Sequence, residues 1–147
     1  MTNDSGTALV IIDAANVVGS RPDGWWRDRR GANERLRDAL ASLSKYGFGG
    51  LAPPLRIVLV VEGQARGITS LPTVDVVSAS GSGDDTIVEL VATDPDSERW
   101  VVTADRGLRE RVQSLGAQVL GPGTLRTERD AWQQRADDIW YARILVL

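Results

Sequence analysis

The sequence predicts an α/β protein with a central, largely parallel sheet, and two observations support this prediction. Short, uninterrupted apolar runs recur along the chain, and this character is typical of strands that are buried on both faces. Segments of helical periodicity lie between these runs. Strands that alternate with helices in this way indicate a parallel sheet with helices packed against it.

Five apolar runs predict the strands, and the first of them follows a small, polar N-terminal segment. The runs are residues 8–12, 55–61, 73–77, 99–103 and 118–120. Apolar side chains that share one helical face predict three helices, at residues 31–46, 84–93 and 104–115. The last helix is expected to end at Gly116, in the position of a helix C-terminal glycine.

The length of 147 residues corresponds to one domain. We expect residues 1–7 to form a flexible leader and residues 8–147 a single domain, with a C-terminal helix and tail at residues 126–147. Trp132, Trp140 and the apolar chain end suggest a homodimer contact there. Because no apolar run approaches the roughly 20 residues of a membrane span, or forms a signal-peptide core, the sequence predicts a cytoplasmic protein without membrane attachment.

The chain contains no cysteine and no histidine. These absences exclude disulfides, thiolate catalysis, zinc sites of the Cys/His type and every histidine general base. Carboxylate, hydroxyl, amide and guanidinium groups remain, and a metal ion held by such groups would be Mg²⁺ or Mn²⁺. The net charge of −3 indicates that a site for a polyanion would be local.

Acidic residues follow four of the predicted strands, and they are Asp13, Glu62, the pair Asp84 and Asp85, and Asp105. The carboxyl ends of parallel strands lie at one edge of a sheet, where ligands of open α/β sheets bind. We therefore expect these carboxylates to converge, and their repulsion favours a bound cation. The alternative is helix capping, a common role for aspartate at the start of a helix, which suits Asp84, Asp85 and Asp105.

Five short motifs occur in order along the chain: residues 12–18 (IDAANVV), 60–63 (VVEG), 83–87 (GDDTI), 101–106 (VVTADR) and 116–122 (GAQVLGP). In order and spacing they resemble the NYN branch of the PIN-like nucleases, including the YacP-like proteins, over roughly residues 8–125. The resemblance implies a three-layer α/β/α PIN-like domain. It also implies that an acidic pocket binds Mg²⁺ or Mn²⁺ and hydrolyses RNA phosphodiester bonds.

The resemblance assigns roles by position. The catalytic residues that it implies are Asp13, Asn16, Asp84, Asp85 and Asp105. The metal ligands that it implies are Asp13, Asp84, Asp85, Asp105 and Glu62, the last standing where relatives tend to have aspartate. We expect Asp13, Asp85 and Asp105 to be the principal ligands, with Asp84 next. Metal-assisted cleavage needs no histidine, because the cation lowers the pKa of its bound water.

Residues 20–30 combine arginine and tryptophan in the most unusual composition of the chain. Arginine binds phosphate and aromatic rings stack on unpaired bases, so this segment is expected to hold single-stranded RNA. The expected nucleic-acid-binding residues are Arg21, Trp25, Trp26, Arg27, Arg29, Arg30, Thr103 and Arg106. The alternative is that the tryptophans pack a helix onto the sheet while the arginines pair with Asp23, Asp28 and Glu34.

Three functions remain open from the sequence. The first is a metal-dependent ribonuclease, which the resemblance and the Arg/Trp segment favour. The second is a nucleotide pyrophosphohydrolase that uses the same ions on a small phosphate ester, which the negative net charge favours. The third is a non-catalytic RNA-binding module with the same fold.

Overall fold

A computed structural model describes residues 7–22 and 24–125, and its centre is one sheet of five parallel strands. The strands are β1 (Ala8–Asp13), β2 (Leu55–Val61), β3 (Val74–Ser78), β4 (Arg99–Val102) and β5 (Gln118–Leu120). Their order across the sheet is β3-β2-β1-β4-β5, and each neighbouring pair is parallel. The predicted α/β class and parallel sheet are therefore confirmed.

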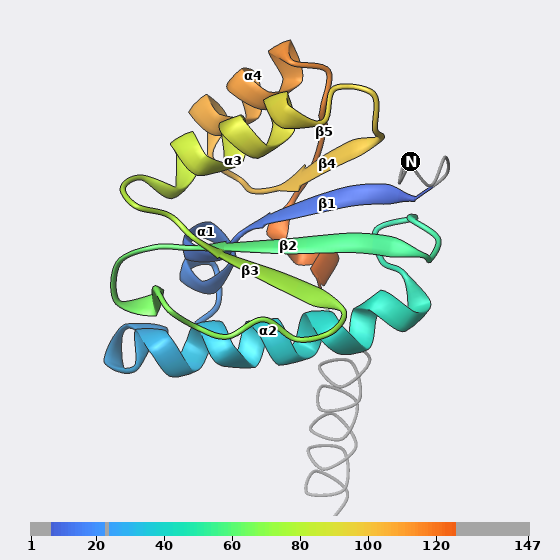
Figure 1. The fold of residues 1–147 in the computed structure, drawn as a ribbon. Helices are drawn as coiled ribbons and strands as arrows, with labels where there is room; N and C mark the ends of the chain where they lie inside the picture. Colours follow the sequence, from blue (N-terminus) through green and yellow to red (C-terminus); the bar gives the residue numbers. More distant parts are fainter. Residues whose placement is uncertain (1–6, 23, 126–147) are drawn as a thin grey trace, which may run out of the picture.

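Helices cover both faces of the sheet and give the fold three layers (Figure 1). On one face lie α1 (Ala14–Gly19) and α2 (Arg29–Tyr46), and on the other lie α3 (Gly83–Thr93) and α4 (Arg106–Ser114). Short 3-10 helices lie in the connections, and they are η1 (Trp25–Arg27), η2 (Gly63–Ala65) and η3 (Pro122–Leu125). Of the four α-helices within the described residues, three match predicted segments, whereas α1 was not expected.

The central strand β1 supplies side chains to both halves of the core. All six of its residues are buried. Val10 and Ile12 pack in the cluster that contains Leu40 and the rest of the buried face of α2. Leu9 and Ile11 pack in the second cluster, together with the buried side chains of α3 and α4. This alternation follows from the two-residue period of a strand, and it explains why the sequence of β1 is apolar at consecutive positions.

The connection order creates a crevice at the carboxyl end of β1. From β1 the chain moves outward to β2 and β3, and it then crosses to β4 on the other side of β1. In open α/β sheets, ligands bind outside the carboxyl ends of the strands at such a reversal of strand order. The end of β1 and the end of β4 are therefore the place to look for a site.

Buried Arg99, the first residue of β4, joins the ends of two helices. It is 6% exposed and donates hydrogen bonds to the carbonyl oxygens of Val91 (2.6 Å), Ser97 (3.2 Å) and Leu115 (2.8 Å). Val91 lies in the last turn of α3, and Leu115 caps the end of α4. The last carbonyls of a helix have no partner within the helix, so one guanidinium group serves both ends.

The helix ends also test two further expectations. Gly116 directly follows the C-cap of α4 with φ of +92°, as predicted for a helix C-terminal glycine. Residues 1–6 of the predicted leader and the predicted C-terminal helix and tail at residues 126–147, with the proposed homodimer contact, lie outside the described residues.

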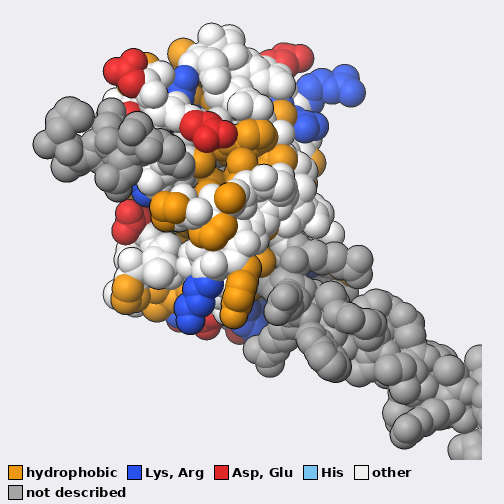
Figure 2. Space-filling view, turned by 90° about the vertical axis from the view of Figure 1, so that its right-hand side faces the viewer, with side chains coloured by type: hydrophobic (Ala, Val, Ile, Leu, Met, Phe, Trp, Pro, Cys, Tyr) orange, Lys and Arg blue, Asp and Glu red, His pale blue; other side chains and the backbone are white. Residues whose placement is uncertain are grey.

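The remaining surface offers no membrane-spanning element in the described part of the chain. Within residues 7–22 and 24–125, every helix is too short or too polar to cross a bilayer. Figure 2 looks onto the amino ends of the strands, where hydrophobic side chains gather near the centre and charged side chains lie at the margins. The carboxyl ends of the strands, where the acidic residues lie, are at the opposite side of the molecule (Figure 1).

Candidate active site

Asp13 is the buried centre of the site. It is the last residue of β1 and the N-cap of α1, so that the strand passes into the helix without a loop. Asp13 is only 6% exposed. One carboxylate oxygen accepts a hydrogen bond from the backbone N–H of Asn16 (3.3 Å), and the other accepts one from the Thr103 hydroxyl (2.9 Å). Both oxygens are thus held in a fixed direction at the carboxyl end of β1. The strand order reverses there, and we call this place the switch point of the sheet.

The turn after β4 is tied to the turn after β1. The Thr103 hydroxyl, which donates to Asp13, accepts a hydrogen bond from the backbone N–H of Asp105 (3.1 Å). The amide oxygen of Asn16 accepts a hydrogen bond from the backbone N–H of Ala104 (2.8 Å). Residues that are about 90 positions apart therefore form one network. In this network Asn16 and Thr103 position the two acidic turns relative to each other.

Glu62 connects the end of β2 to the start of α3. Its Oε2 atom accepts a hydrogen bond from the backbone N–H of Gly83 (2.5 Å), the first residue of α3. A Cβ atom added at Gly83 would lie 2.7 Å from that same oxygen, so glycine is the residue that permits the contact. The contact places the Glu62 carboxylate beside the helix turn that carries Asp84.

Four carboxylates form one electrostatic group, which we call the acidic cluster: Asp13, Glu62, Asp84 and Asp105. The pKa of Asp13 is raised from 3.8 to about 6, first by burial and then by the charges of Asp84 and Glu62, against the hydrogen bonds from Thr103 and Asn16, which lower it. The pKa of Asp84 is also raised, first by burial and then by Asp105 and Glu62. The cluster therefore joins the ends of β1 and β2 with the starts of α3 and α4.

Asp85, expected to be a principal metal ligand, points elsewhere in the structure. Its carboxylate accepts a hydrogen bond from Arg111 of α4 at 3.0 Å, in an ion pair whose Asp85 side chain is 68% exposed. Adjacent helix residues point about 100° apart, so Asp84 and Asp85 cannot both face the cluster with the same geometry. It is Asp84 whose pKa is raised by Asp105 and Glu62, whereas Arg111 lowers it.

The capping alternative holds for Asp13, the N-cap of α1, and for one of the three later aspartates. Asp105 is the N-cap of α4, and its Oδ1 atom accepts a hydrogen bond from the backbone N–H of Leu108 (2.8 Å). For α3 the cap is Ser82, whose hydroxyl accepts from the backbone N–H of Asp85 (3.4 Å). Asp84 and Asp85 instead lie in the first turn of α3, where negative charge is favoured by the helix dipole.

The donor chemistry of the acidic cluster fits a hard divalent cation. All of its donors are oxygen atoms, and the like charges are held together against their repulsion. Among the residues that the structure describes, no three acidic side chains are arranged as a ready-made metal site. Mg²⁺ commonly needs only one or two carboxylates, with water and substrate phosphate as its other ligands, so this arrangement fits such a site.

The Arg/Trp segment lies beside this site, and its two tryptophans differ. Trp25 is half-buried and packs against the core, whereas Trp26 is 56% exposed. Their rings meet edge to face at 6.1 Å. The guanidinium groups of Arg27 and Arg29 lie over the rings of Trp26 (5.9 Å) and Trp25 (5.2 Å), respectively. The packing alternative is therefore correct for Trp25 alone.

The other arginines of the expected nucleic-acid-binding set contact backbone or are exposed. Arg30 donates to the carbonyl oxygen of Arg66 (2.9 Å), and Arg21 donates to that of Leu125 (3.5 Å). Arg106 is exposed at the start of α4. No ion pair joins these arginines to Asp28 or Glu34, and Asp23 is outside the described ranges, 7–22 and 24–125.

Layers, strand order and the position of the crevice define a three-layer α/β/α fold of the PIN-like type. Among solved structures, the chain is similar to Rae1 (YacP) from Bacillus subtilis, with a TM-score of 0.66 and 17% identity over 92% of this chain and 80% of that one. The W164L mutant of the same protein gives a TM-score of 0.66 and 17% identity, over 88% and 79%. No family model and no curated protein matches the sequence. The YacP-like fold predicted from the motifs is therefore confirmed.

Proposed function

We propose that the protein is a metal-dependent ribonuclease that hydrolyses RNA phosphodiester bonds at the acidic cluster. The observation that carries this proposal is the gathering of Asp13, Glu62, Asp84 and Asp105 at the switch point of the sheet, where hydrogen bonds of Thr103, Asn16 and Gly83 tie their turns together. Two neighbouring carboxylates whose pKa values are raised, here Asp13 and Asp84, are a functional-site signature when they lie where ligands bind in this kind of sheet. The motif resemblance to NYN-type PIN-like nucleases assigns these four positions together with Asp85.

Each residue of the cluster has a role that its contacts support. Asp13 and Asp84 would hold Mg²⁺ or Mn²⁺, with Glu62 and Asp105 completing the negative environment. A bound cation of this kind lowers the pKa of its water and neutralises charge on the phosphate. Thr103 and Asn16 keep the Asp13 carboxylate in place through the hydrogen bonds described above. The exposed Arg27 attracts the phosphates of the RNA.

A nucleotide phosphohydrolase is the second candidate. The net charge of −3 favours a small substrate over a long RNA, which is a polyanion. Both candidates use the same acidic cluster. They differ in the substrate that the protein turns over, and one experiment separates them.

The test is incubation of the purified chain with labelled single-stranded RNA and, separately, with nucleoside triphosphates. We expect RNA cleavage with Mn²⁺ or Mg²⁺ and none with EDTA. The carboxylates alone provide no Lewis acid that could bind the phosphate oxygens or lower the pKa of a water molecule. Asp84→Asn is expected to lower the rate by about 10²-fold or more, as loss of a metal-binding carboxylate does. Asp85→Asn, the matched neighbour in the surface ion pair, is expected to change the rate by less than about threefold.

Three outcomes would contradict the proposal. Cleavage that persists in EDTA would exclude the metal-dependent reaction. Turnover of nucleoside triphosphates without RNA cleavage would establish the second candidate instead. RNA binding that is independent of metal, with no cleavage of either substrate, would identify a non-catalytic RNA-binding module.

A further inference from the structure

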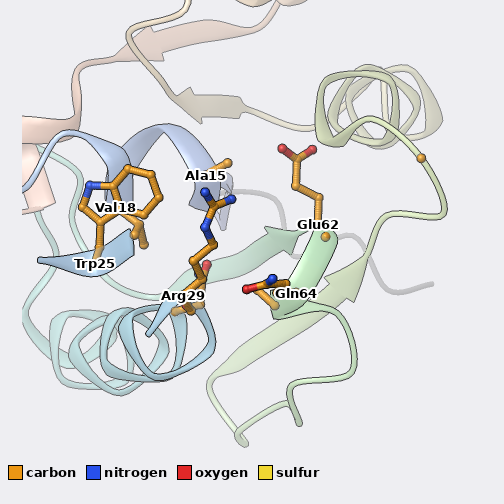
Figure 3. A pocket seen from close by; sticks show the side chains of 10 residues that line it. Ala15, Val18, Trp25, Arg29, Glu62 and Gln64 are labelled. Carbon is orange, nitrogen blue, oxygen red and sulfur yellow. Dashed lines mark hydrogen bonds between the residues drawn. The ribbon is translucent and has the colours of Figure 1, made fainter. Parts of the chain in front are cut away.

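A pocket of about 380 Å³ adjoins the acidic cluster and shares Glu62 with it. Figure 3 shows its walls: Trp25 and Arg29 stand on one side, and Glu62 and Gln64 stand on the other. Its volume is near the lower end of the range of about 300–1,000 Å³ that is usual for small-molecule sites. The pocket therefore fits a group the size of one nucleotide and excludes a folded helix of RNA.

Arg29 and Trp25 form a flat, cationic wall of this pocket. The guanidinium group of Arg29 lies over the Trp25 ring at 5.2 Å, and Trp25 is itself fixed against the core. Arg29 is the first residue of α2, and the N-cap Asp28 before it supplies the negative charge that the helix dipole favours at this end. The Arg29 side chain is exposed. A guanidinium plane backed by an aromatic ring is a surface on which nucleobases stack.

The remaining walls provide hydrogen-bonding groups above an apolar floor. Ala15, Val18 and Ala65 supply apolar surface. Gln64 in η2 is exposed and presents a side-chain amide with both a donor and an acceptor. The amide nitrogen of Asn33 donates to the carbonyl oxygen of Arg29 (2.7 Å), so this buried side chain also holds the first turn of α2 beside the pocket. Stacking surface, apolar floor and amide groups together match the faces and the edge of a nucleobase.

We infer that this pocket binds one unpaired nucleobase of the RNA substrate, next to the phosphate that lies at the acidic cluster. This inference rests on the proposed function and deepens it. Arg29, backed by Trp25, stacks on the face of the base, and Gln64 contacts its edge. Glu62 is the shared boundary, since its Oε2 atom is held by the backbone of Gly83 at the cluster. The pocket therefore gives the enzyme a preference for single-stranded RNA and for particular bases at one position beside the cut.

The experiment compares cleavage of a single-stranded RNA with a randomised sequence by the wild-type chain and by Arg29→Met and Gln64→Ala. Loss of one stacking surface is expected to raise KM about tenfold in Arg29→Met while kcat changes little. Gln64→Ala is expected to weaken the base preference at the position flanking the cut. Arg35→Met and Gln113→Ala replace exposed side chains of the same types outside the pocket, and they are expected to match the wild type. Thermal unfolding of every variant confirms that it is folded.

The outcomes separate this inference from the proposed function. If the wild type cleaves RNA and both pocket variants keep its KM and its base preference, the pocket assignment is wrong and the nuclease remains. If KM rises equally in Arg29→Met and Arg35→Met, the effect is general attraction of phosphate and the base pocket is again wrong. If the wild type cleaves no RNA, the proposed function fails, and the inference that rests on it fails too.

Discussion

Asp13→Asn is expected to stabilise the fold at pH 7.5 while it lowers RNA cleavage by about 10²-fold or more. Asp13 is buried among carboxylates, and its pKa is raised from 3.8 to about 6. Keeping this group charged in the folded chain therefore costs about 3 kcal/mol at neutral pH, which is the free energy that corresponds to the difference between its folded and unfolded pKa values. A neutral side chain of the same shape removes that cost, and its amide oxygen can accept from the backbone N–H of Asn16 while its NH2 group donates to the Thr103 hydroxyl, so that this second hydrogen bond reverses.

The stabilisation by Asp13→Asn is expected to depend on pH. Because the pKa of Asp13 is raised on folding, the folded chain binds this proton more tightly than the unfolded chain. The contribution of Asp13 to stability therefore increases as the pH falls from above 6 towards 3.8, and the destabilisation by its charge is complete above 6. The advantage of Asp13→Asn over the wild type is expected to be largest at pH 7.5 and to shrink towards pH 4.

Urea unfolding of both proteins in EDTA, at several pH values between about 4 and 8, measures this difference. Asp75→Asn, an exposed aspartate on β3, is the matched control and is expected to unfold like the wild type at each pH. An Asp13→Asn variant that is no more stable than the wild type at pH 7.5 would contradict the claim that the buried charge of Asp13 destabilises the fold.

Arg99→Met is expected to lower the free energy of unfolding by about 3 kcal/mol. The substitution keeps much of the apolar stem but removes three hydrogen bonds that a charged group donates to carbonyl oxygens. The buried carbonyl of Val91 at the end of α3 then lacks a partner, and the partly buried carbonyl of Leu115 at the end of α4 loses its link to β4. Arg99→Lys is expected to recover only part of the loss, because one ammonium group lacks the fork geometry of guanidinium.

Urea unfolding at neutral pH measures this loss, with Arg56→Met as the control. Arg56 forms an exposed ion pair with Asp94 at 3.3 Å, and loss of such a pair changes stability by less than about 1 kcal/mol. Equal stability of Arg99→Met and Arg56→Met would show that the hydrogen bonds of Arg99 at the helix ends do not contribute to the free energy of unfolding.

The sheet could be predicted from the sequence because its signals are local. The β1 segment is uninterrupted by polar residues until Asp13, and this pattern alone indicates a strand buried on both faces. The acidic residues directly follow the strands. Because the strands are parallel, these residues lie at the same edge of the sheet. Helix α1 was missed because its six residues are too few to display a helical period.

The direction of individual side chains could not be predicted in the same way. Asp84 and Asp85 are adjacent and chemically identical, and the choice between them depends on which side of the first turn of α3 faces Glu62 and which side faces Arg111. That choice is a tertiary property. Gln64 and Asn33 were missed as well, because a side-chain amide carries no sequence signature of its own. They gain significance only when the fold places them around one pocket.

Binding of Mn²⁺, followed by the loss of the electron paramagnetic resonance signal of the free ion, tests the central claim most directly. The wild-type chain is expected to bind Mn²⁺ without RNA, and Asp13→Asn is expected to weaken that affinity about tenfold or more, as removal of a ligand does. Asp75→Asn is expected to bind like the wild type. Equal affinity of all three proteins would contradict the assignment of the acidic cluster as a metal site.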